Sequence, residues 1–360
     1  MAKILFSLLI FAMICPSSVK AKTKYTAIDA EYETPTHLSP GDNIAFALFL
    51  VKKKNKKVLI SDKKYDLLKV VTDGCEFQNG ILIVNNNEKT IHHHTVTVLF
   101  MLAEDTSVNK KIVFKLDYCT TQHCYDCQGA TGTAGLQGKD RGTPLIGCEG
   151  TNGNDGQPAL NGANCTGGHV FLQLVYDSSL KTSMLHIAVK CEGSAAMQYY
   201  LVNPNGGKLL VSGRGGQGGQ GGPGGNGGDG KDAQLQAGLL KVDRDGCQGG
   251  NGGNGGNGGD GGNSGTLVIR FDPSAEAYSS CIIADVSGGP GGPGGQGGIG
   301  GQGGQGLTTT GVTKYDLAIG EEWKLKPGFR GENGHTGQPG KAGVEGLVRK
   351  EYGTVTIPWW

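Results

Sequence analysis

Charge of either sign is scarce in this sequence of 360 residues. Only 18% of the residues are charged, and 33 basic residues nearly balance 32 acidic ones, so the formal net charge is +1. A nucleic-acid-binding protein normally carries a basic excess, and a charge-driven disordered tail carries a strong net charge. The composition argues against both classes.

Catalytic signatures are missing as well. The sequence has no Gly-x-Ser-x-Gly elbow and no His-Glu-x-x-His pair, and its carboxylates are scattered singly. The Gly-x-Gly-x-x-Gly patterns that occur arise from repetition, without a Walker lysine or a strand–loop–helix context. We therefore expect no enzymatic activity and no cofactor.

Long apolar runs are confined to the first residues. Residues 1–21 contain Lys3, an apolar stretch over 4–14 and then Val19-Lys20-Ala21, which is the pattern of a secretory signal peptide. An acylated lipoprotein cysteine at Cys15 is the alternative. No later apolar run reaches the ~18 residues that a membrane span needs. We expect a secreted or cell-surface protein with no membrane-spanning segment in the mature chain.

Glycine is what the sequence has in excess. It holds 66 glycines, of which 51 fall in six runs. The runs, numbered 1 to 6 in chain order, cover residues 129–138, 147–162, 213–230, 246–262, 288–306 and 331–346. Outside them the frequency of glycine is ordinary, so six unusual inserts interrupt a normal β-rich chain.

The runs share a period of three residues. Runs 3, 4 and 5 are nearly perfect Gly-Gly-x repeats, and runs 1, 2 and 6 are looser Gly-x-x repeats. This is the period of a polyproline-II-type helix, whose backbone has no internal hydrogen bonds and must pair with neighbours. We therefore expect a bundle of polyglycine-II helices, with the Gly-Gly-x runs inside its layers and the Gly-x-x runs at its rims.

Three other structures are typical of glycine-rich sequence: a flexible linker, a collagen triple helix and a phosphate-binding loop. The similar lengths of five runs and the near absence of serine among the x residues disfavour a linker. The 13 prolines are too few for collagen.

The Gly-Gly-x runs resemble those of polyglycine-II-bundle proteins, namely the glycine-rich antifreeze proteins of snow fleas and the tip adhesins of some phage tail fibres. The similarity is one of period and covers the six runs only. It implies a rigid brick that displays side chains or loops to a partner. The signal peptide disfavours a phage product. The x residues, mostly Gln, Asn, Asp and Pro, disfavour a flat ice-binding face.

Strand patterns dominate the rest of the chain. In residues 22–118, β-branched and aromatic stretches at 44–51, 58–60, 81–84, 96–102 and 111–116 predict a β-sandwich. Segment 34–42, which precedes them, resembles the entry of immunoglobulin-like modules. Residues 119–360 alternate glycine runs with strands expected at 169–176, 184–191, 199–202, 208–211, 267–271, 282–286 and 353–358. The predicted fold is all-β with polyglycine-II helices: signal peptide 1–21, Ig-like sandwich 22–118 and mixed β/polyglycine-II domain 119–360.

Nine cysteines follow the signal peptide: Cys75, Cys119, Cys124, Cys127, Cys148, Cys165, Cys191, Cys247 and Cys281. In an exported chain they predict disulfides, here at the junction of sandwich and bundle, with one thiol left over and the connectivity open. The spacing Cys119-x4-Cys124-x2-Cys127 also matches plant-type ferredoxin ligands, with Cys148 as a fourth. A zinc site at Cys124 and Cys127 with His123 or His169 is a further alternative. Disulfides are preferred over both.

Two further features suggest contacts or modification. Asn164-Cys165-Thr166 is an N-glycosylation sequon. Trp359 and Trp360 either pack on the protein's own strands or anchor a partner.

These features together favour a secreted, non-enzymatic structural protein that docks with itself or with a cell-surface complex. The alternative is an adhesin that binds a glycan or a receptor through its Asn and Gln x residues and its loops. A secreted hydrolase is a third hypothesis, which would need carboxylates brought together by the fold.

Overall fold

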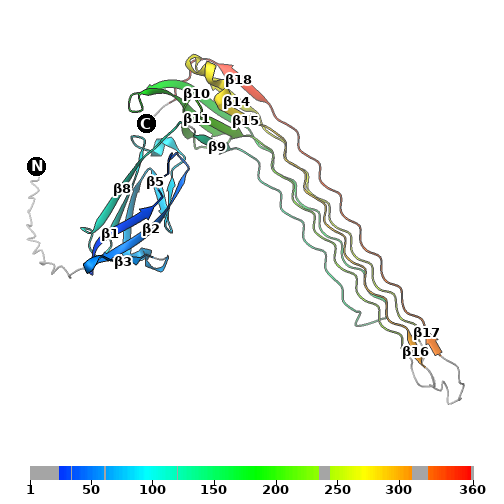
Figure 1. The fold of residues 1–360 in the computed structure, drawn as a ribbon. Coiled ribbons are helices and arrows are strands. Elements are labelled where there is room, and N and C mark those ends of the chain that lie inside the picture. The colour runs from blue at the N-terminus through cyan, green and yellow to red at the C-terminus, as the bar shows by residue number, and fades with distance from the viewer. Residues whose placement is uncertain are drawn as a thin grey trace, which may run out of the picture. The chain divides into compact units, whose positions relative to one another are not determined.

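The structure is a computed structural model that describes residues 24–33, 35–60, 62–119, 121–234, 244–309 and 323–357. The described part is an all-β fold with a few short 3-10 segments and two disulfides (Figure 1). It divides into two compact units: unit 1 holds the residues up to 85 and residues 90–116, and unit 2 holds residues 86–89 and those from 117 onward. The expected signal peptide and the two terminal tryptophans, Trp359 and Trp360, lie outside the described residues.

Unit 1 consists of two antiparallel sheets. Its strands are β1 (Tyr25–Tyr32), β2 (Asn43–Lys52), β3 (Lys56–Leu59), β4 (Leu68–Asp73), β5 (Cys75–Gln78), β6 (Ile81–Val84), β7 (Thr95–Leu102) and β8 (Asn109–Lys115). One sheet has the order β1-β2-β6-β5, with β3 also paired to β2, and the other has the order β4-β7-β8. The 3-10 segments η1 (Lys53–Asn55) and η2 (Asp62–Leu67) lie between strands, and η3 (Glu88–Thr90), whose first two residues belong to unit 2, follows β6 in the chain.

The core of unit 1 follows from alternation along these strands. In β7, Val96, Val98, Phe100 and Leu102 are fully buried and alternate with partly exposed residues, because successive side chains of a strand point to opposite faces. Aromatic rings of the two sheets meet there. The ring centroid of Phe100 lies 5.9 Å from that of Phe46 in β2 and 5.0 Å from that of Phe77 in β5.

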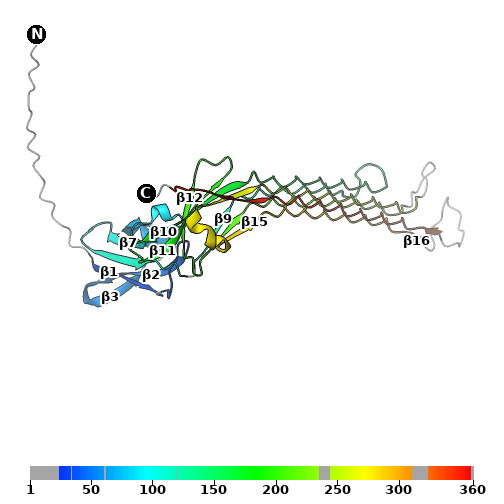
Figure 2. The same ribbon diagram turned by 90° about the horizontal axis from the view of Figure 1, so that it is seen from above.

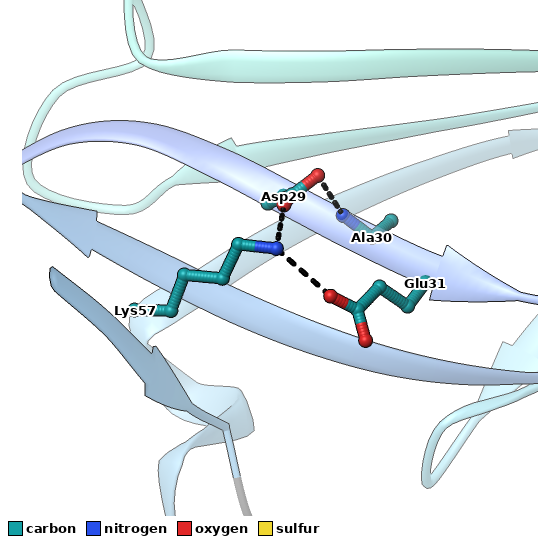
Figure 3. Close-up of polar contacts among 4 residues, drawn as sticks. All are labelled: Asp29, Ala30, Glu31 and Lys57. Carbon is teal, nitrogen blue, oxygen red and sulfur yellow. Dashed lines mark hydrogen bonds and ion pairs between the residues drawn. The ribbon is translucent and has the colours of Figure 1, made fainter. Parts of the chain in front are cut away.

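An ion-pair cluster lies on the surface of unit 1 (Figure 3). Lys57 Nζ lies 2.6 Å from Asp29 Oδ2 and 2.8 Å from Glu31 Oε1. The hydrogen bond from Lys57 lowers the pKa of the Asp29 carboxyl below its ordinary value of 3.8, and the Ala30 N–H acts in the same direction. Since the folded-state pKa is depressed, the contribution of Asp29 to stability is present at neutral pH and is lost as the pH falls through the folded pKa.

We expect the substitution Lys57→Met to raise the pKa of Asp29 toward its ordinary value, because the main cause of the shift is removed. The change in stability at neutral pH should be small, since exposed ion pairs contribute little. An NMR titration of the Asp29 carboxyl measures its pKa. The control is the substitution Lys111→Met, which replaces another exposed lysine. An Asp29 pKa that is unchanged in Lys57→Met would contradict the assignment.

Unit 2 contains the remaining strands. They are β9 (Gln122–Asp126), β10 (Gly168–Asp177), β11 (Thr182–Cys191), β12 (Gln198–Val202), β13 (Lys208–Ser212), β14 (Leu267–Phe271), β15 (Ile282–Asp285), β16 (Leu307–Thr309), β17 (Trp323–Leu325) and β18 (Val348–Tyr352), with the 3-10 segment η4 (Pro273–Cys281) after β14. Two sheets, β12-β11-β10-β14-β18 and β15-β13-β9, share one hydrophobic core that includes Leu172, Ile187 and Leu209. The strands β16 and β17 form a separate pair.

The glycine runs continue the strands of these two sheets. Runs 1, 3 and 5 follow β9, β13 and β15, which pair in parallel, and runs 2, 4 and 6 lead into β10, β14 and β18, which also pair in parallel. Figures 1 and 2 show the runs extending side by side from the sheets as long, wavy segments. We call runs 1, 3 and 5 the outward row and runs 2, 4 and 6 the return row.

The prediction of a strand at 353–358 is wrong. The last strand is β18, which pairs with β14 directly after run 6. Residues 354–357 pair with no strand: the Val355 N–H binds Asp272 Oδ2 at 3.2 Å, and Val355 and Ile357 pack against Ala188 and Tyr199. The apolar alternation there reflects this packing and not a sheet ladder.

Candidate functional site

The candidate functional site is the body formed by the six runs, in which neighbours are set by backbone hydrogen bonds. Within a row, each run donates to the next run in parallel; for example, the Gly218 N–H binds Pro290 O at 2.9 Å. Between rows, consecutive runs pair antiparallel; for example, the Gly222 N–H binds Gln157 O at 2.9 Å. Both kinds of bond recur every three residues. Runs 3 and 4 have a run on each side in their row, whereas runs 1 and 2 begin the rows and runs 5 and 6 end them.

The repeat has three positions, which we call first, second and x; in run 4 they are Gly255, Gly256 and Asn257. A Cβ at the first position would meet the next run along the chain, which belongs to the other row: at Gly255 it would lie 1.9 Å from Gly295 O. A Cβ at the second position would meet the preceding run of the same row: at Gly256 it would lie 2.0 Å from Gln157 O. Because these neighbours are backbone atoms, a Cβ at either position pushes the adjacent run away, which favours glycine where the neighbour exists. Within the runs, Ala159 at a first position of run 2 is an exception.

This rule accounts for the different glycine patterns of the runs. Runs 3, 4 and 5 each have a next run along the chain and a preceding run in their own row, and they carry glycine at both the first and the second position. Runs 1 and 2 begin their rows, so their second positions carry side chains such as Thr133 and Leu160. Run 6 has no following run, so its first positions carry side chains such as Asn333 and Thr336. The expectation that every Gly-Gly-x run lies inside a layer is wrong for run 5, because this run ends its row. It nevertheless packs against runs 3, 4 and 6, so both of its glycine positions face another run.

A second hydrogen-bond pattern involves the side chains at the x position. Asn254 Oδ1 accepts the His335 N–H at 2.9 Å, and the next residue, Gly255, donates its N–H to His335 O at 2.8 Å. The two bonds hold both backbone groups of one residue in the neighbouring run, and we call this arrangement an Asx clasp. It recurs at Asp140, Asn152, Asp155, Asn161, Asn164, Asn226, Asp229, Asp232, Asp245, Asn251, Asn257, Asp260 and Asn263.

The position of Asn and Asp follows from what the clasp needs. A clasp requires a following run in the same row, and the x residues of runs 5 and 6, which have none, include no Asn or Asp. A clasp also requires an N–H on the facing residue. Opposite Pro290 and Pro293, which lack one, run 3 carries Gln217 and Gln220. The Asx clasp was missed by sequence reasoning, although the absence of Asn and Asp from the x positions of runs 5 and 6 was a readable signal.

We expect Asn254→Ala to destabilise unit 2 by about 1 kcal/mol, the net contribution of one hydrogen bond, because the His335 N–H loses its acceptor. Asn254→Asp keeps an oxygen at the same place and should therefore lose less stability than Asn254→Ala. Urea unfolding of unit 2 measures the difference. The matched control is Gln296→Ala, an exposed x residue of run 5 without a clasp. Equal losses in Asn254→Ala and Gln296→Ala would contradict the role of the clasp.

Four of the nine predicted cysteines form disulfides. Cys127, just after β9, pairs with Cys191 at the end of β11, where the rows leave the sheets. Cys148 pairs with Cys247 at the starts of runs 2 and 4, which is the opposite end of the rows. The disulfides therefore tie the runs at both ends.

The other five cysteines, Cys75, Cys119, Cys124, Cys165 and Cys281, are thiols in the structure, whereas the sequence predicted one. Burial raises the pKa of Cys75 to about 11 and also raises the pKa of Cys281. A hydrogen bond with Asp117 raises the pKa of Cys119. Thiols with raised pKa values are protonated at neutral pH and are poor nucleophiles. The described residues contain no group of three or more His, Cys, Asp or Glu that could hold a metal ion.

The sequon residue Asn164 lies at the surface near the end of run 2. Its Oδ1 accepts the Asn263 N–H at 2.8 Å, so the residue takes part in a clasp. The next residue, Cys165, is a buried thiol whose Sγ donates to Cys127 O.

The connection between runs 1 and 2 exposes apolar side chains at the end of the rows far from the sheets. Leu145 is 98% exposed and Ile146 is 94% exposed, and Phe329, close to the start of run 6, is 82% exposed. Lys231, the residue directly after run 3, donates a hydrogen bond from its Nζ to Leu145 O at 3.2 Å and so holds this connection beside the end of run 3. We call residues 143–146 the distal loop.

Comparisons with known proteins add no assignment. No protein-family model matches the chain, and a search of curated proteins finds no match. Among the residues that the structure describes, no helix is both long and apolar enough to span a bilayer.

Proposed function

We propose that this chain is a secreted or cell-surface, non-enzymatic structural protein whose six runs form a rigid polyglycine-II bundle, attached to an N-terminal Ig-like β-sandwich. The observation that carries the proposal is the lateral hydrogen-bond repeat of three residues, with a would-be Cβ at most of the run glycines only about 2 Å from a backbone atom of the adjacent run. A polyproline-II-type backbone has no internal hydrogen bonds, so neighbouring runs must supply its partners. At ~3.1 Å per residue, run 5 would be about 60 Å long.

Rigidity follows from how the runs are held. Each run inside a row is hydrogen-bonded on several sides, and at most of the run glycines a would-be Cβ would lie 1.7–2.3 Å from a backbone atom of the adjacent run, which opposes sliding of one run past another. Disulfides at both ends of the rows oppose fraying. Their presence is compatible with an extracellular location. The six runs are therefore suited to hold the groups at the two ends of the rows at a fixed separation.

Docking with a second copy would have to use surfaces other than the row edges. A second copy placed beyond run 6 would meet the side chains at the first positions of run 6, such as Thr336. A copy placed before run 1 would meet the side chains at the second positions of run 1, such as Leu136. These side chains occupy the place where a further backbone would pack. Self-assembly would therefore proceed through the x faces or through the ends of the rows.

Hydrogen exchange tests the bundle, and sedimentation with electron microscopy tests the assembly. In the mature protein, the glycine amides of runs 3 and 4 should exchange slowly and become accessible together in one cooperative transition. Free exchange throughout the runs would leave a flexible linker as the better description. A strict monomer that binds neither cells nor extracellular polymers would refute the assembly role while leaving the bundle intact.

An adhesin that binds a glycan or a receptor is the second candidate, and two observations favour it. The distal loop exposes Leu145 and Ile146, and the x residues of run 6 are not used as clasp acceptors. Among the latter, Glu332 and His335 line a shallow polar hollow of about 270 Å³ beside Asn254. A glycan array and a cell-binding assay would test the idea, with Leu145→Ser/Ile146→Ser and Glu332→Ala/His335→Ala as variants. Binding that neither variant weakens would exclude both surfaces.

A further inference from the structure

Asn-Gly sequences are the ones most prone to spontaneous deamidation. The backbone nitrogen of the glycine attacks Cγ of the asparagine side chain, ammonia leaves, and a succinimide ring forms. Water then opens the ring to aspartate or isoaspartate. The reaction requires a glycine N–H that can lose its proton and a side chain that can turn toward it.

Unit 2 is rich in this sequence. Six Asn-Gly pairs lie at clasp positions of the runs: Asn152-Gly153, Asn161-Gly162, Asn226-Gly227, Asn251-Gly252, Asn254-Gly255 and Asn257-Gly258. Two further pairs lie outside the clasps: Asn205-Gly206 in the turn between β12 and β13, and Asn333-Gly334 in run 6. Asn333 Oδ1 accepts the Gly300 N–H at 3.0 Å, and the Gly334 N–H is donated to Gly298 O at 2.8 Å, so both groups of this pair are also hydrogen-bonded. An unprotected chain of this composition would accumulate isoaspartate throughout the runs.

The clasp engages both reacting groups of each pair. At Asn226, Oδ1 accepts the Ile299 N–H at 2.8 Å, and the Gly227 N–H is donated to Ile299 O at 2.9 Å. The side chain is thus held toward the neighbouring run, and the glycine nitrogen keeps its proton in a hydrogen bond. A Cβ at Gly227 would lie 2.0 Å from Gly250 O, so the close packing also prevents the backbone from rotating into the geometry of attack.

The turn pair lacks these constraints. Asn205 and Gly206 are exposed, and within the described residues the Gly206 N–H has no hydrogen-bond acceptor. The Asn205 side chain makes no hydrogen bond there either; only its backbone N–H is engaged, with Asn203 Oδ1 at 2.9 Å. Both reacting groups of this pair are free to meet.

We propose that the Asx clasps protect six of the seven Asn-Gly pairs of the runs from deamidation, that the hydrogen bonds of Asn333 and Gly334 protect the seventh, and that Asn205 is the deamidation site of unit 2. The same hydrogen bonds that join the runs thereby make the body chemically durable. Water is the only co-reactant, so no enzyme is needed for the modification at Asn205.

Ageing the mature protein at mildly alkaline pH tests the proposal. Native and urea-unfolded samples are incubated side by side, and isoaspartate at each Asn-Gly pair is quantified by peptide mass spectrometry. In the native protein we expect the clasped pairs to react at least about tenfold more slowly than Asn205, since two hydrogen bonds must open first. In urea all pairs should react at similar rates. Clasped pairs that react as fast as Asn205 in the native protein would overturn the proposal.

A matched variant separates the clasp from general rigidity. Ile299→Pro removes the N–H that Asn226 Oδ1 accepts but keeps the carbonyl that binds Gly227, and run 5 already carries Pro290 and Pro293 at equivalent positions. We expect deamidation of Asn226 to increase severalfold in this variant, while Asn254 stays at its wild-type rate. If Asn226 remains as inert as in the wild type, the side-chain bond does not provide the protection and the clasp mechanism is wrong.

Discussion

Gly256→Ala is expected to prevent the runs of unit 2 from packing as they do in the structure. Gly256 is a second-position glycine in the middle of run 4, where it donates to Gly222 O at 2.7 Å and accepts from Gly295 N–H at 2.8 Å. The new Cβ would lie 2.0 Å from Gln157 O, and separating the runs to relieve this contact would break the bonds on both sides. We expect the loss of stability to exceed about 4 kcal/mol, which few single substitutions reach.

The control for this prediction is Gln220→Ala, which introduces the same methyl side chain at an exposed x position of run 3. The free energy of unfolding of this variant should lie within about 0.5 kcal/mol of the wild-type value, as is usual for surface substitutions. Circular dichroism, denaturant unfolding and hydrogen exchange of the run amides compare the two. A Gly256→Ala protein with wild-type unfolding and slow exchange would mean that the runs are not packed as described.

Removal of the Cys148–Cys247 disulfide should have the next largest effect. The bond joins residues 99 positions apart, and a loop of about 100 residues corresponds to an upper value of about 4.7 kcal/mol in the chain-entropy model. Cys148→Ser/Cys247→Ser should therefore destabilise unit 2 by several kcal/mol and accelerate exchange first at the starts of runs 2 and 4, where the bond ties them together.

Urea unfolding with and without a reductant measures this effect. Cys119→Ser serves as the control, because Cys119 is an exposed thiol outside both disulfides. If the double variant and the reduced wild type unfold at the same urea concentration as the oxidised wild type, the bond does not contribute to stability and the lateral hydrogen bonds suffice alone.

Strands that bury one face could be read from the sequence, whereas polar strands could not. The stretches expected at 44–51, 81–84 and 96–102 correspond to β2, β6 and β7, and those expected at 184–191 and 267–271 correspond to β11 and β14. Seven strands were missed because they are short, alternate weakly or carry charged residues: β1, β4, β5, β9, β16, β17 and β18. They are strands because a neighbour pairs with them: β9 with β13, and β18 with β14.

The roles of the x residues could be predicted only in part. Asn and Gln look alike as polar x residues, and the alternative adhesin hypothesis gave both the same role, contact with a glycan. The structure separates them, since Asn254 Oδ1 accepts a backbone N–H of run 6, whereas Gln217 faces Pro290, which offers none. The difference depends on which run lies alongside, and that is a property of the rows and not of any one run.

The sequence by itself determined the class of the fold and the period of the runs. Apolar alternation specifies strands because the side chains of a strand alternate between two faces, and a glycine every third residue leaves a bare backbone edge whose period of three suits neither helix nor strand. Only the tertiary structure decided which run lies beside which, which glycines are indispensable and which cysteines pair. Those depend on the order in which β9, β13 and β15, and β10, β14 and β18, pair in their sheets, because each run leaves or enters a strand and takes its place in the row from it.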